Sequence, residues 1–334
     1  MKTLPFFVAS LTIAIPIDQS LADVTIEDIT VHGPSLVGNL EGDSTDRQVF
    51  VYLPPGYGDD SDRRYPVVYL LHGYGGGADT WNSFHDLAGR MNAAFADGSR
   101  ELIIVAPDAE TLHLGSFYSN SVTIGDWETY IAGDLVEYVD SHYRTIPSRD
   151  ARAIAGFSMG GYGTWRIAMK RPDVYAVAYA MSACCLAPAA SSARFASLDE
   201  ITTLEQARNL SMGRTSLALA AAWAPDPNNP PFYVAKPTEN GEPRPEFLAA
   251  MNANAPIAML HQYVPALLQF EAIGMEIGLQ DGLLQGNERL HELLDEYGIE
   301  HRWETYEGGH GEILGERMQL RMLPFMSEHL YFGE

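Results

Sequence analysis

Short apolar runs alternate with longer segments of helical periodicity along most of the chain. The runs that we predict to be strands are 24–31, 48–54, 66–73, 101–108, 151–158, 175–182, 275–281 and 301–307. Runs such as "PVVYLLHG" and "ELIIVAPD" are apolar without alternation. This pattern is typical of strands that are covered on both faces of a parallel sheet. The first two runs favour an antiparallel pair.

Three segments between these runs have the spacing of amphipathic helices. They are 126–143, 159–172, which stops at a proline, and 287–298, which stops at a glycine. Strands that alternate with helices predict an α/β fold built on a mostly parallel, doubly wound sheet.

The alternation breaks between residues 186 and 265. Alanine-rich helical pieces stand there beside the segment "PDPNNPPFYVAKPTENGEPRP". We interpret this stretch as an insertion over the edge of the sheet, a candidate cap over the active site. The prediction is therefore one domain over residues 23–334 with a cap-like insertion.

The first 22 residues differ from the rest of the chain. Lys2 is followed by the apolar stretch "TLPFFVASLTIAIPI" and then by "SLA". This order predicts a signal peptide over residues 1–22, cleaved after Ala22, and a secreted or periplasmic protein. A membrane anchor or a buried first element is the alternative.

The chain is strongly acidic, with 21 Lys and Arg against 44 Asp and Glu and a formal net charge of −23. Such a surface repels nucleic acids and anionic membranes, so we expect neither as a partner once the signal peptide is removed.

The cysteines and histidines suggest no metal or cofactor site. Cys184 and Cys185 are adjacent, and a disulfide between neighbours is strained, so we expect two small buried apolar side chains. We find no Cys/His cluster with zinc spacing and no phosphate-binding loop. The prediction is that the protein needs no metal and no cofactor.

The clearest chemical signal is "AIAGFSMGGYG", residues 153–163, which places Ser158 between a predicted strand and a predicted helix. A G-x-S-x-G motif in this context forms a sharp turn that exposes the serine hydroxyl. The glycines leave room for that turn, and the helix N-terminus favours developing negative charge. We predict Ser158 to be a nucleophile.

A serine nucleophile needs a base and an acid that orients the base. His310 stands in the glycine-rich stretch "YEGGHGE" after a predicted strand. When a G-x-S-x-G serine is followed along the chain by the acid and then by the histidine, the base lies late in the sequence, as His310 does. Asp281 directly follows the strand "MEIGLQ" and is the predicted acid, with Glu276 as the alternative.

The other histidines that could compete as a base lie on the surfaces of predicted elements. We expect these side chains to be solvated: His142, His291 and His301.

Acyl transfer also needs two N–H donors for the oxyanion. One is the backbone of the residue after the nucleophile, Met159. The other is expected at Tyr74 in the loop "LLHGYGGGADTW", because the glycines of this loop let the backbone turn an N–H toward the serine.

These motifs, in this order, are similar to the group of α/β hydrolases that includes esterase D, feruloyl esterases and mycolyltransferases. The similarity rests on "YPVVYLLHGYGGGADTW", "SFYSNS", "DWETYIAGDLVEYVDSHYRT", "AIAGFSMGGYGTWRIAMKRPDVYAVAYAMS" and "YEGGHGE". The resemblance implies the α/β-hydrolase fold and a serine carboxylesterase with Ser158, Asp281 and His310. It also implies substrate contacts in the loops and the active-site wall. The candidates are His72, Gly73, Phe117, Tyr118, Trp127 and Glu128.

The resemblance to this group of hydrolases does not determine the substrate. We expect an exported esterase acting on feruloyl, aryl or short-acyl esters, either small molecules or linked to a polysaccharide. An S-formylglutathione hydrolase-like thioesterase and a mycolyltransferase-type acyltransferase are alternatives. A peptidase of the same fold and a non-catalytic binding protein are the alternatives from other classes.

Overall fold

The computed structural model describes residues 23–209 and 213–333, so the predicted signal peptide lies outside the described residues. The strands of the main sheet are β1 (Thr25–His32), β2 (Asp46–Leu53), β3 (Val67–Leu71), β4 (Ile103–Pro107), β7 (Arg152–Phe157), β8 (Val177–Met181), β11 (Ala272–Gly278) and β12 (Arg302–Tyr306). Each of the eight predicted strands is present, with ends that differ by a few residues.

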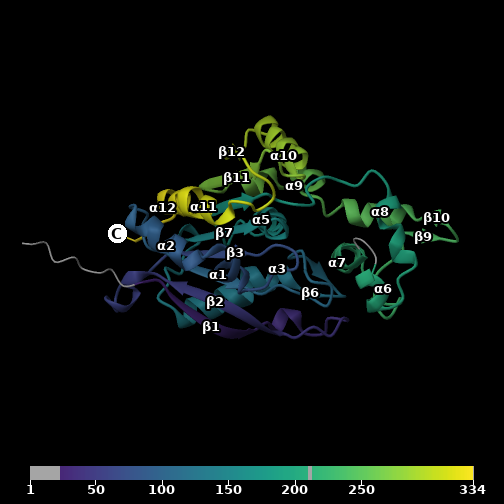
Figure 1. Cartoon of the computed structure of the whole chain (residues 1–334), viewed down its shortest axis with the longest axis horizontal. Coiled ribbons are helices and arrows are strands. Elements are labelled where there is room, and N and C mark those ends of the chain that lie inside the picture. Colours follow the sequence, from purple (N-terminus) through teal and green to yellow (C-terminus); the bar gives the residue numbers. More distant parts are fainter. Residues whose placement is uncertain (1–22, 210–212, 334) are drawn as a thin grey trace, which may run out of the picture.

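Helices connect most of these strands (Figure 1). They are α1 (Thr80–His85), α2 (Leu87–Ala96), α3 (Trp127–Thr129), α4 (Leu135–His142), α5 (Met159–Lys170), α6 (Leu204–Asn209), α7 (Gly213–Trp223), α8 (Pro245–Asn252), α9 (Pro256–Leu267), α10 (Leu284–Glu296), α11 (Leu314–Arg317) and α12 (Leu323–His329). A π-helical turn joins α3 to α4, so the predicted helix over 126–143 is nearly continuous.

The sheet has the order β1-β2-β4-β3-β7-β8-β11-β12. Strand β2 is antiparallel to both of its neighbours, and the pairs from β4 to β12 are parallel. The predicted α/β fold with a mostly parallel sheet is confirmed. The strands β7, β11 and β12 end at the same edge of the sheet because parallel strands share one direction.

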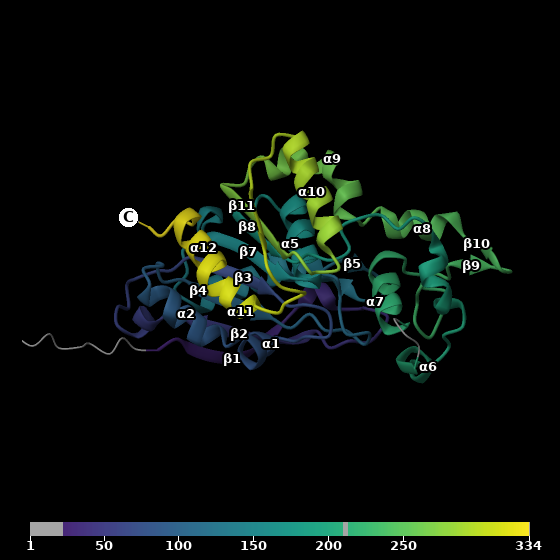
Figure 2. The same cartoon turned by 45° about the horizontal axis from the view of Figure 1, so that its top comes forward.

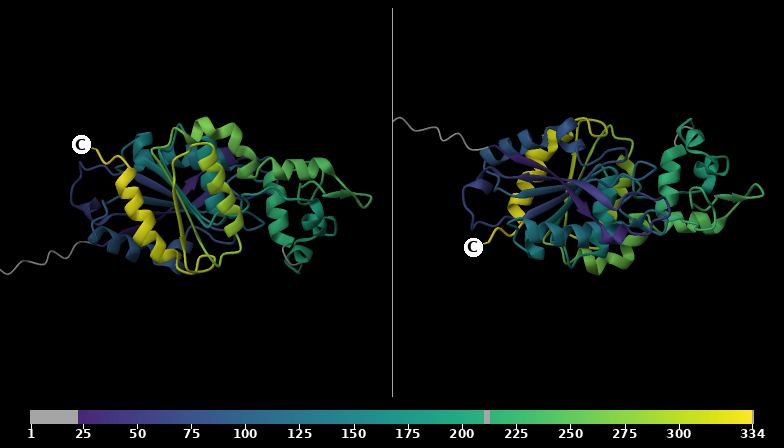
Figure 3. Two further views of the ribbon diagram at one scale, coloured as in Figure 1. Left: turned by 90° about the horizontal axis from the view of Figure 1, so that it is seen from above. Right: turned by 90° about the horizontal axis from the view of Figure 1, so that it is seen from below.

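Helices cover both faces of the sheet (Figure 3). Alternate residues of β3 enter different cores: Tyr69 packs with the core under α3, α4, α5 and α10, and Leu70 with the core under α1, α2, α11 and α12. Burial on both sides explains why this strand is apolar without alternation.

The segment that we predicted as an insertion divides into two parts. Helices α6, α7 and α8 and the hairpin β9–β10 (Thr238–Glu239, Glu242–Pro243) extend beyond the end of the sheet (Figures 1 and 2). Helix α9, in contrast, packs against α5 and α10 on the body of the fold. The outlying part therefore ends near α8.

Among the described residues, no helix combines the length and the apolar character that crossing a membrane requires.

Candidate active site

Ser158 occupies a tight turn between β7 and α5. Its backbone has φ 56° and ψ −111°, a conformation that is strained for a residue with a side chain. A Cβ atom on Gly160 would lie 1.9 Å from the carbonyl oxygen of Leu71, and one on Gly156 would lie 2.3 Å from the oxygen of Gly160. The glycines around Ser158 therefore allow the start of α5 to approach β3 and β7 closely.

The structure brings Ser158, His310 and Asp281 together in one chain of hydrogen bonds. The Ser158 Oγ lies 3.0 Å from Nε2 of His310, and Nδ1 of His310 lies 2.7 Å from Oδ2 of Asp281. A carboxylate only accepts, so Nδ1 carries a proton and Nε2 presents its lone pair to the serine hydroxyl. This is the arrangement in which His310 acts as a base toward Ser158.

The hydrogen-bonded side chains of Asp281 and His310 differ in their exposure to solvent. The Asp281 side chain is 1% exposed, whereas the His310 side chain is 40% exposed and lies at the surface of the cleft. The Phe157 ring packs 4.7 Å from the imidazole centre and limits the orientation of His310. A buried carboxylate in this position can stabilise the imidazolium that forms when a histidine takes the proton of a serine hydroxyl.

Glu276, the alternative acid, lies elsewhere. Its side chain is buried and accepts hydrogen bonds from Tyr179 and Arg317. Asp281 follows the end of β11 by three residues, and the His310 loop follows β12, so the topology places the two loops side by side. The Gln280 N–H donates to the Gly308 oxygen at 3.0 Å and joins these loops.

The predicted oxyanion donors flank the serine. Met159 is the first residue of α5, so its N–H has no partner within the helix. In the loop after β3, the Gly75 N–H donates to Leu114 and the Gly76 N–H donates to Gly73. These two N–H groups are therefore committed to other carbonyls, which agrees with the choice of Tyr74 without singling it out, and both oxyanion donors remain predictions.

A cleft of about 740 Å³ opens at Ser158 and His310. Its walls come from the β3–α1 loop, the segment after β8, helix α7 and the start of α10. The residues along it are Tyr74, Phe117, Ser158, Ala183, Cys184, Cys185, Leu186, Ala187, Thr215, Leu219, Asp281, Gly282, Leu283, Gln285, Gly286 and His310. None of these side chains is a lysine or an arginine.

Two cysteines line the cleft, a position that the sequence did not predict. Cys184 and Cys185 are not joined by a disulfide and pack against the core as expected, but they are only half-buried and line the cleft. They follow β8, the neighbour of the β7 strand that carries Ser158, and the Cys184 N–H donates to the Ser158 carbonyl. Their position after a central strand was the signal that could have placed them at the site.

Of the predicted substrate contacts, only Phe117 lines the cleft. His72 is fully buried: its Nε2 accepts the Ala109 N–H, and Nδ1 donates to the Gly73 carbonyl. The Tyr118 hydroxyl donates to the His72 carbonyl and is also buried. His72 and Tyr118 therefore support the loop rather than contact substrate, while Gly73 adjoins Ser158 without lining the cleft.

Trp127 and Glu128 also lie in the interior and not along the cleft. The Trp127 Nε1–H donates to the Ile124 carbonyl. The Glu128 carboxylate accepts hydrogen bonds from Arg166 at 2.6 Å and Lys170 at 2.8 Å, both on α5. Glu128 thus fixes the helix that begins at the serine, and the prediction that these two residues contact substrate is wrong.

A pair of buried titratable groups lies behind the loop of Tyr74. Glu41 and His113 have side chains with no exposed surface and approach within 3.3 Å. Burial, reinforced by Asp43, raises the pKa of Glu41 to about 9, and burial lowers the pKa of His113 to about 4. Both groups are therefore neutral near pH 7. The Tyr74 hydroxyl donates to the His113 carbonyl, which connects this pair to the cleft wall.

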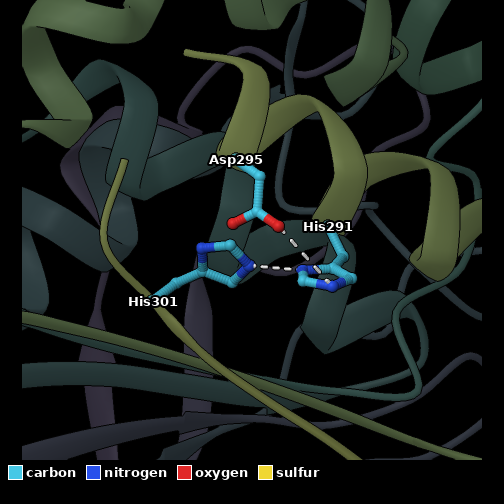
Figure 4. Close-up of side chains that lie close together, drawn as sticks. All are labelled: His291, Asp295 and His301. Carbon is cyan, nitrogen blue, oxygen red and sulfur yellow. Dashed lines mark hydrogen bonds and ion pairs between the residues drawn. The ribbon is translucent and has the colours of Figure 1, made fainter. Parts of the chain in front are cut away.

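Two histidines that we expected to be solvated are not. His291 on α10 and His301 before β12 are half-buried, and their Nδ1 and Nε2 atoms lie 2.7 Å apart (Figure 4). His142, in contrast, is exposed as expected.

The fold is that of the α/β hydrolases, and the Ser158–His310–Asp281 geometry is the arrangement expected of a serine hydrolase. A family model named for esterases, with the description "Putative esterase", matches residues 44–313. The chain belongs to this esterase family, as the resemblance in its motifs predicted.

Several curated relatives match part of the chain by sequence, including the following two. An esterase of Mycobacterium tuberculosis is 36% identical over 126 residues, 36% of this chain and 26% of the relative. An endo-1,4-beta-xylanase/feruloyl esterase of Xylanibacter ruminicola is 33% identical over 129 residues, 37% of this chain and 18% of the relative. The matches thus span about a quarter or less of the length of these relatives.

Among solved structures, a ferulic acid esterase superposes with a TM-score of 0.69 at 21% identity. The superposition covers 92% of this chain and all of that one. At this identity the likeness supports the fold.

Proposed function

We propose that the protein is an exported serine carboxylesterase that cleaves carboxylic esters through an acyl-enzyme. The observation that carries the proposal is the hydrogen-bonded chain from Ser158 through His310 to the buried Asp281, at the floor of a cleft large enough for a small ester. Membership in the esterase family supports the same reaction.

In the first half of the proposed reaction, Nε2 of His310 takes the proton of the Ser158 hydroxyl while Oγ attacks the ester carbonyl carbon. The N–H groups of Met159 and Tyr74 stabilise the resulting oxyanion. The carbonyl re-forms as the bond to the alkoxy group breaks, and His310 passes its proton to the departing alcohol. In the second half, water attacks the acyl-serine with His310 again as the base, which releases the acid and restores Ser158.

The cleft favours a neutral, partly apolar acyl group. Phe117, Leu219 and Leu186 give it apolar walls, and none of the described residues that line it is a lysine or an arginine that could pair with an anionic substrate. A glutathione thioester carries two carboxylates, whose pairing such a cleft does not offer. We therefore favour aryl and short-acyl esters, including feruloyl esters linked to carbohydrate, a choice that the named feruloyl esterase among the relatives supports.

Export is proposed from the N-terminal sequence alone. The predicted cleavage after Ala22 is tested by expressing the full chain in a bacterial host and sequencing the N-terminus of the protein released from the periplasm. A mature protein that begins at Asp23 supports the proposal, and a protein that keeps Met1 and remains in the cytoplasm refutes it.

The substrate is tested by comparing kcat/KM for methyl ferulate, acetylated xylan, p-nitrophenyl acetate and S-formylglutathione, with Ser158→Ala as the control. We expect the feruloyl ester to be the best substrate and the variant to be inactive on every ester. Faster turnover of S-formylglutathione than of any ester would refute the substrate class. An active Ser158→Ala protein would refute the mechanism.

A further inference from the structure

A second group of side chains has the spacing of a metal site. His291 and Asp295 stand one turn apart on α10, and His301 stands just before β12 (Figure 4). One possible ligand atom from each residue lies within 4.8 Å of the other two. Strand β12 pairs with β11 and not with α10, so no backbone ladder joins the two segments. The three side chains nevertheless converge between them.

The hydrogen bonds around His301 prepare it to be a ligand. Its Nδ1 lies 2.8 Å from the carbonyl oxygen of Ile299. A carbonyl only accepts, so Nδ1 carries the proton and Nε2 presents a lone pair toward His291. Histidines that bind metals are held in this way, with the second ring nitrogen donating to a carbonyl or carboxylate.

His291 is held by packing. Its ring stacks on Trp303 at 4.9 Å with an interplanar angle of 15°, and its Nδ1 faces Nε2 of His301 at 2.7 Å. Its Nε2 lies 3.9 Å from the Asp295 carboxylate. Without an ion, His291 donates from Nδ1 to His301. An ion would need the other neutral tautomer, with the proton on Nε2 and the lone pair on Nδ1.

Two imidazole nitrogens and a carboxylate oxygen are the donor set of many three-ligand zinc sites, with water in the fourth position. Tetrahedral Zn–N bonds of about 2.05 Å separate two ligand nitrogens by about 3.3 Å. The two imidazoles therefore need to move apart by only about 0.6 Å. The Asp295 side chain is 65% exposed, so it has room to rotate toward the ion.

We propose that His291, Asp295 and His301 bind a divalent transition-metal ion, with Zn²⁺ as the preferred one. The ion would tie α10 to the segment before β12. The net charge of −23 favours cations at this surface. None of the three residues lines the cleft, and His291 stands about 7.5 Å further along α10 than Gly286, which does line it. The ion would therefore take no direct part in ester cleavage. Its role would be to stabilise the two elements that border the loops of Asp281 and His310.

The test is calorimetric titration of the purified mature chain, stripped with a chelator, with Zn²⁺. We expect one ion per chain with a micromolar dissociation constant. At a hundredfold excess over that constant, the Tm should rise by about 5 °C. Bound Co²⁺ should show the visible absorption of a four-coordinate site, and bound Cu²⁺ should quench part of the tryptophan fluorescence through Trp303.

Three variants separate this site from general binding to an acidic surface. Asp295→Asn and His291→Gln should each weaken Zn²⁺ binding at least tenfold and abolish the Tm shift. The matched control His142→Gln removes an exposed histidine outside the group and should bind as the wild type does. Asp295 is exposed, so its variant keeps the fold.

Failure to bind one Zn²⁺ per chain at micromolar concentration would overturn the proposal. So would binding that Asp295→Asn and His291→Gln leave unchanged. Hydrolysis of p-nitrophenyl acetate should be equal with and without Zn²⁺, because none of the three ligand residues lines the cleft. The outcome is therefore independent of the proposed esterase reaction.

Discussion

Replacing Gly160 by alanine perturbs the turn that presents the nucleophile. The new Cβ would lie 1.9 Å from the Leu71 oxygen and 2.5 Å from its carbonyl carbon. Cβ atoms in proteins are essentially never closer than 3.0 Å to such atoms, so α5 and β3 must separate by about 1 Å. Both partners are backbone, and no side chain can rotate to relieve the contact.

The separation should affect catalysis more than folding. Ser158 directly precedes α5 and moves with it, whereas His310 and Asp281 belong to other loops. A displacement of 1 Å between reacting groups costs about 100-fold in rate, and overpacking costs about 2 kcal/mol in stability. We therefore expect Gly160→Ala to lower kcat about 100-fold while the protein remains folded.

The assay is the steady-state hydrolysis of p-nitrophenyl acetate together with urea unfolding followed by circular dichroism. Gly133→Ala is the matched control, since its Cβ would meet only Thr129 Cγ2 at 3.4 Å, an ordinary contact. The control should keep the wild-type kcat. A Gly160→Ala protein with the kcat and stability of the wild type would refute the reasoning from close backbone approach.

Three further predictions concern charged groups. Asp281→Asn should lower kcat about 10⁴-fold with little change in KM, because the amide favours the His310 tautomer whose proton is on Nε2. A loss of kcat below tenfold in steady-state assays would contradict this role. Glu128→Gln should reduce the free energy of unfolding, measured in urea, by about 3 kcal/mol, since Arg166 would lose its buried anionic partner. An unchanged free energy of unfolding would contradict a stabilising role of this ion pair. Glu41, with its pKa raised to about 9, keeps a proton in the folded state that the unfolded chain releases above about pH 4.5. Below about pH 6.5 the lowered pKa of His113 contributes the opposite slope, so stability should fall as pH rises from about 6.5 to 9. Glu41→Gln should remove this fall in urea titrations at each pH; a slope equal to that of the wild type would show that another group causes it.

The sequence allowed the sheet and the catalytic candidates to be predicted because both depend on local order along the chain. Apolar runs without alternation marked buried strands such as β3, and a G-x-S-x-G motif between strand and helix marked Ser158. Asp281 and His310 could be found because each follows a strand.

Other features depend on which segments meet in space. His72 stands in a loop beside the serine, but its ring turns inward to the Ala109 N–H, which only the fold shows. Glu128 meets Arg166 and Lys170 because α3 lies against α5. His291 and His301 looked like surface residues because their pairing requires α10 and β12 to converge.

The central claim is that Ser158 forms the covalent acyl-enzyme, and mass spectrometry of the intact protein tests it most directly. Diethyl p-nitrophenyl phosphate transfers one diethylphosphoryl group to an activated serine. We predict an addition of one such group per chain, located on the peptide that contains Ser158, with complete loss of ester hydrolysis and no labelling of Ser158→Ala. Labelling of another residue, or full activity after labelling of Ser158, would contradict the account.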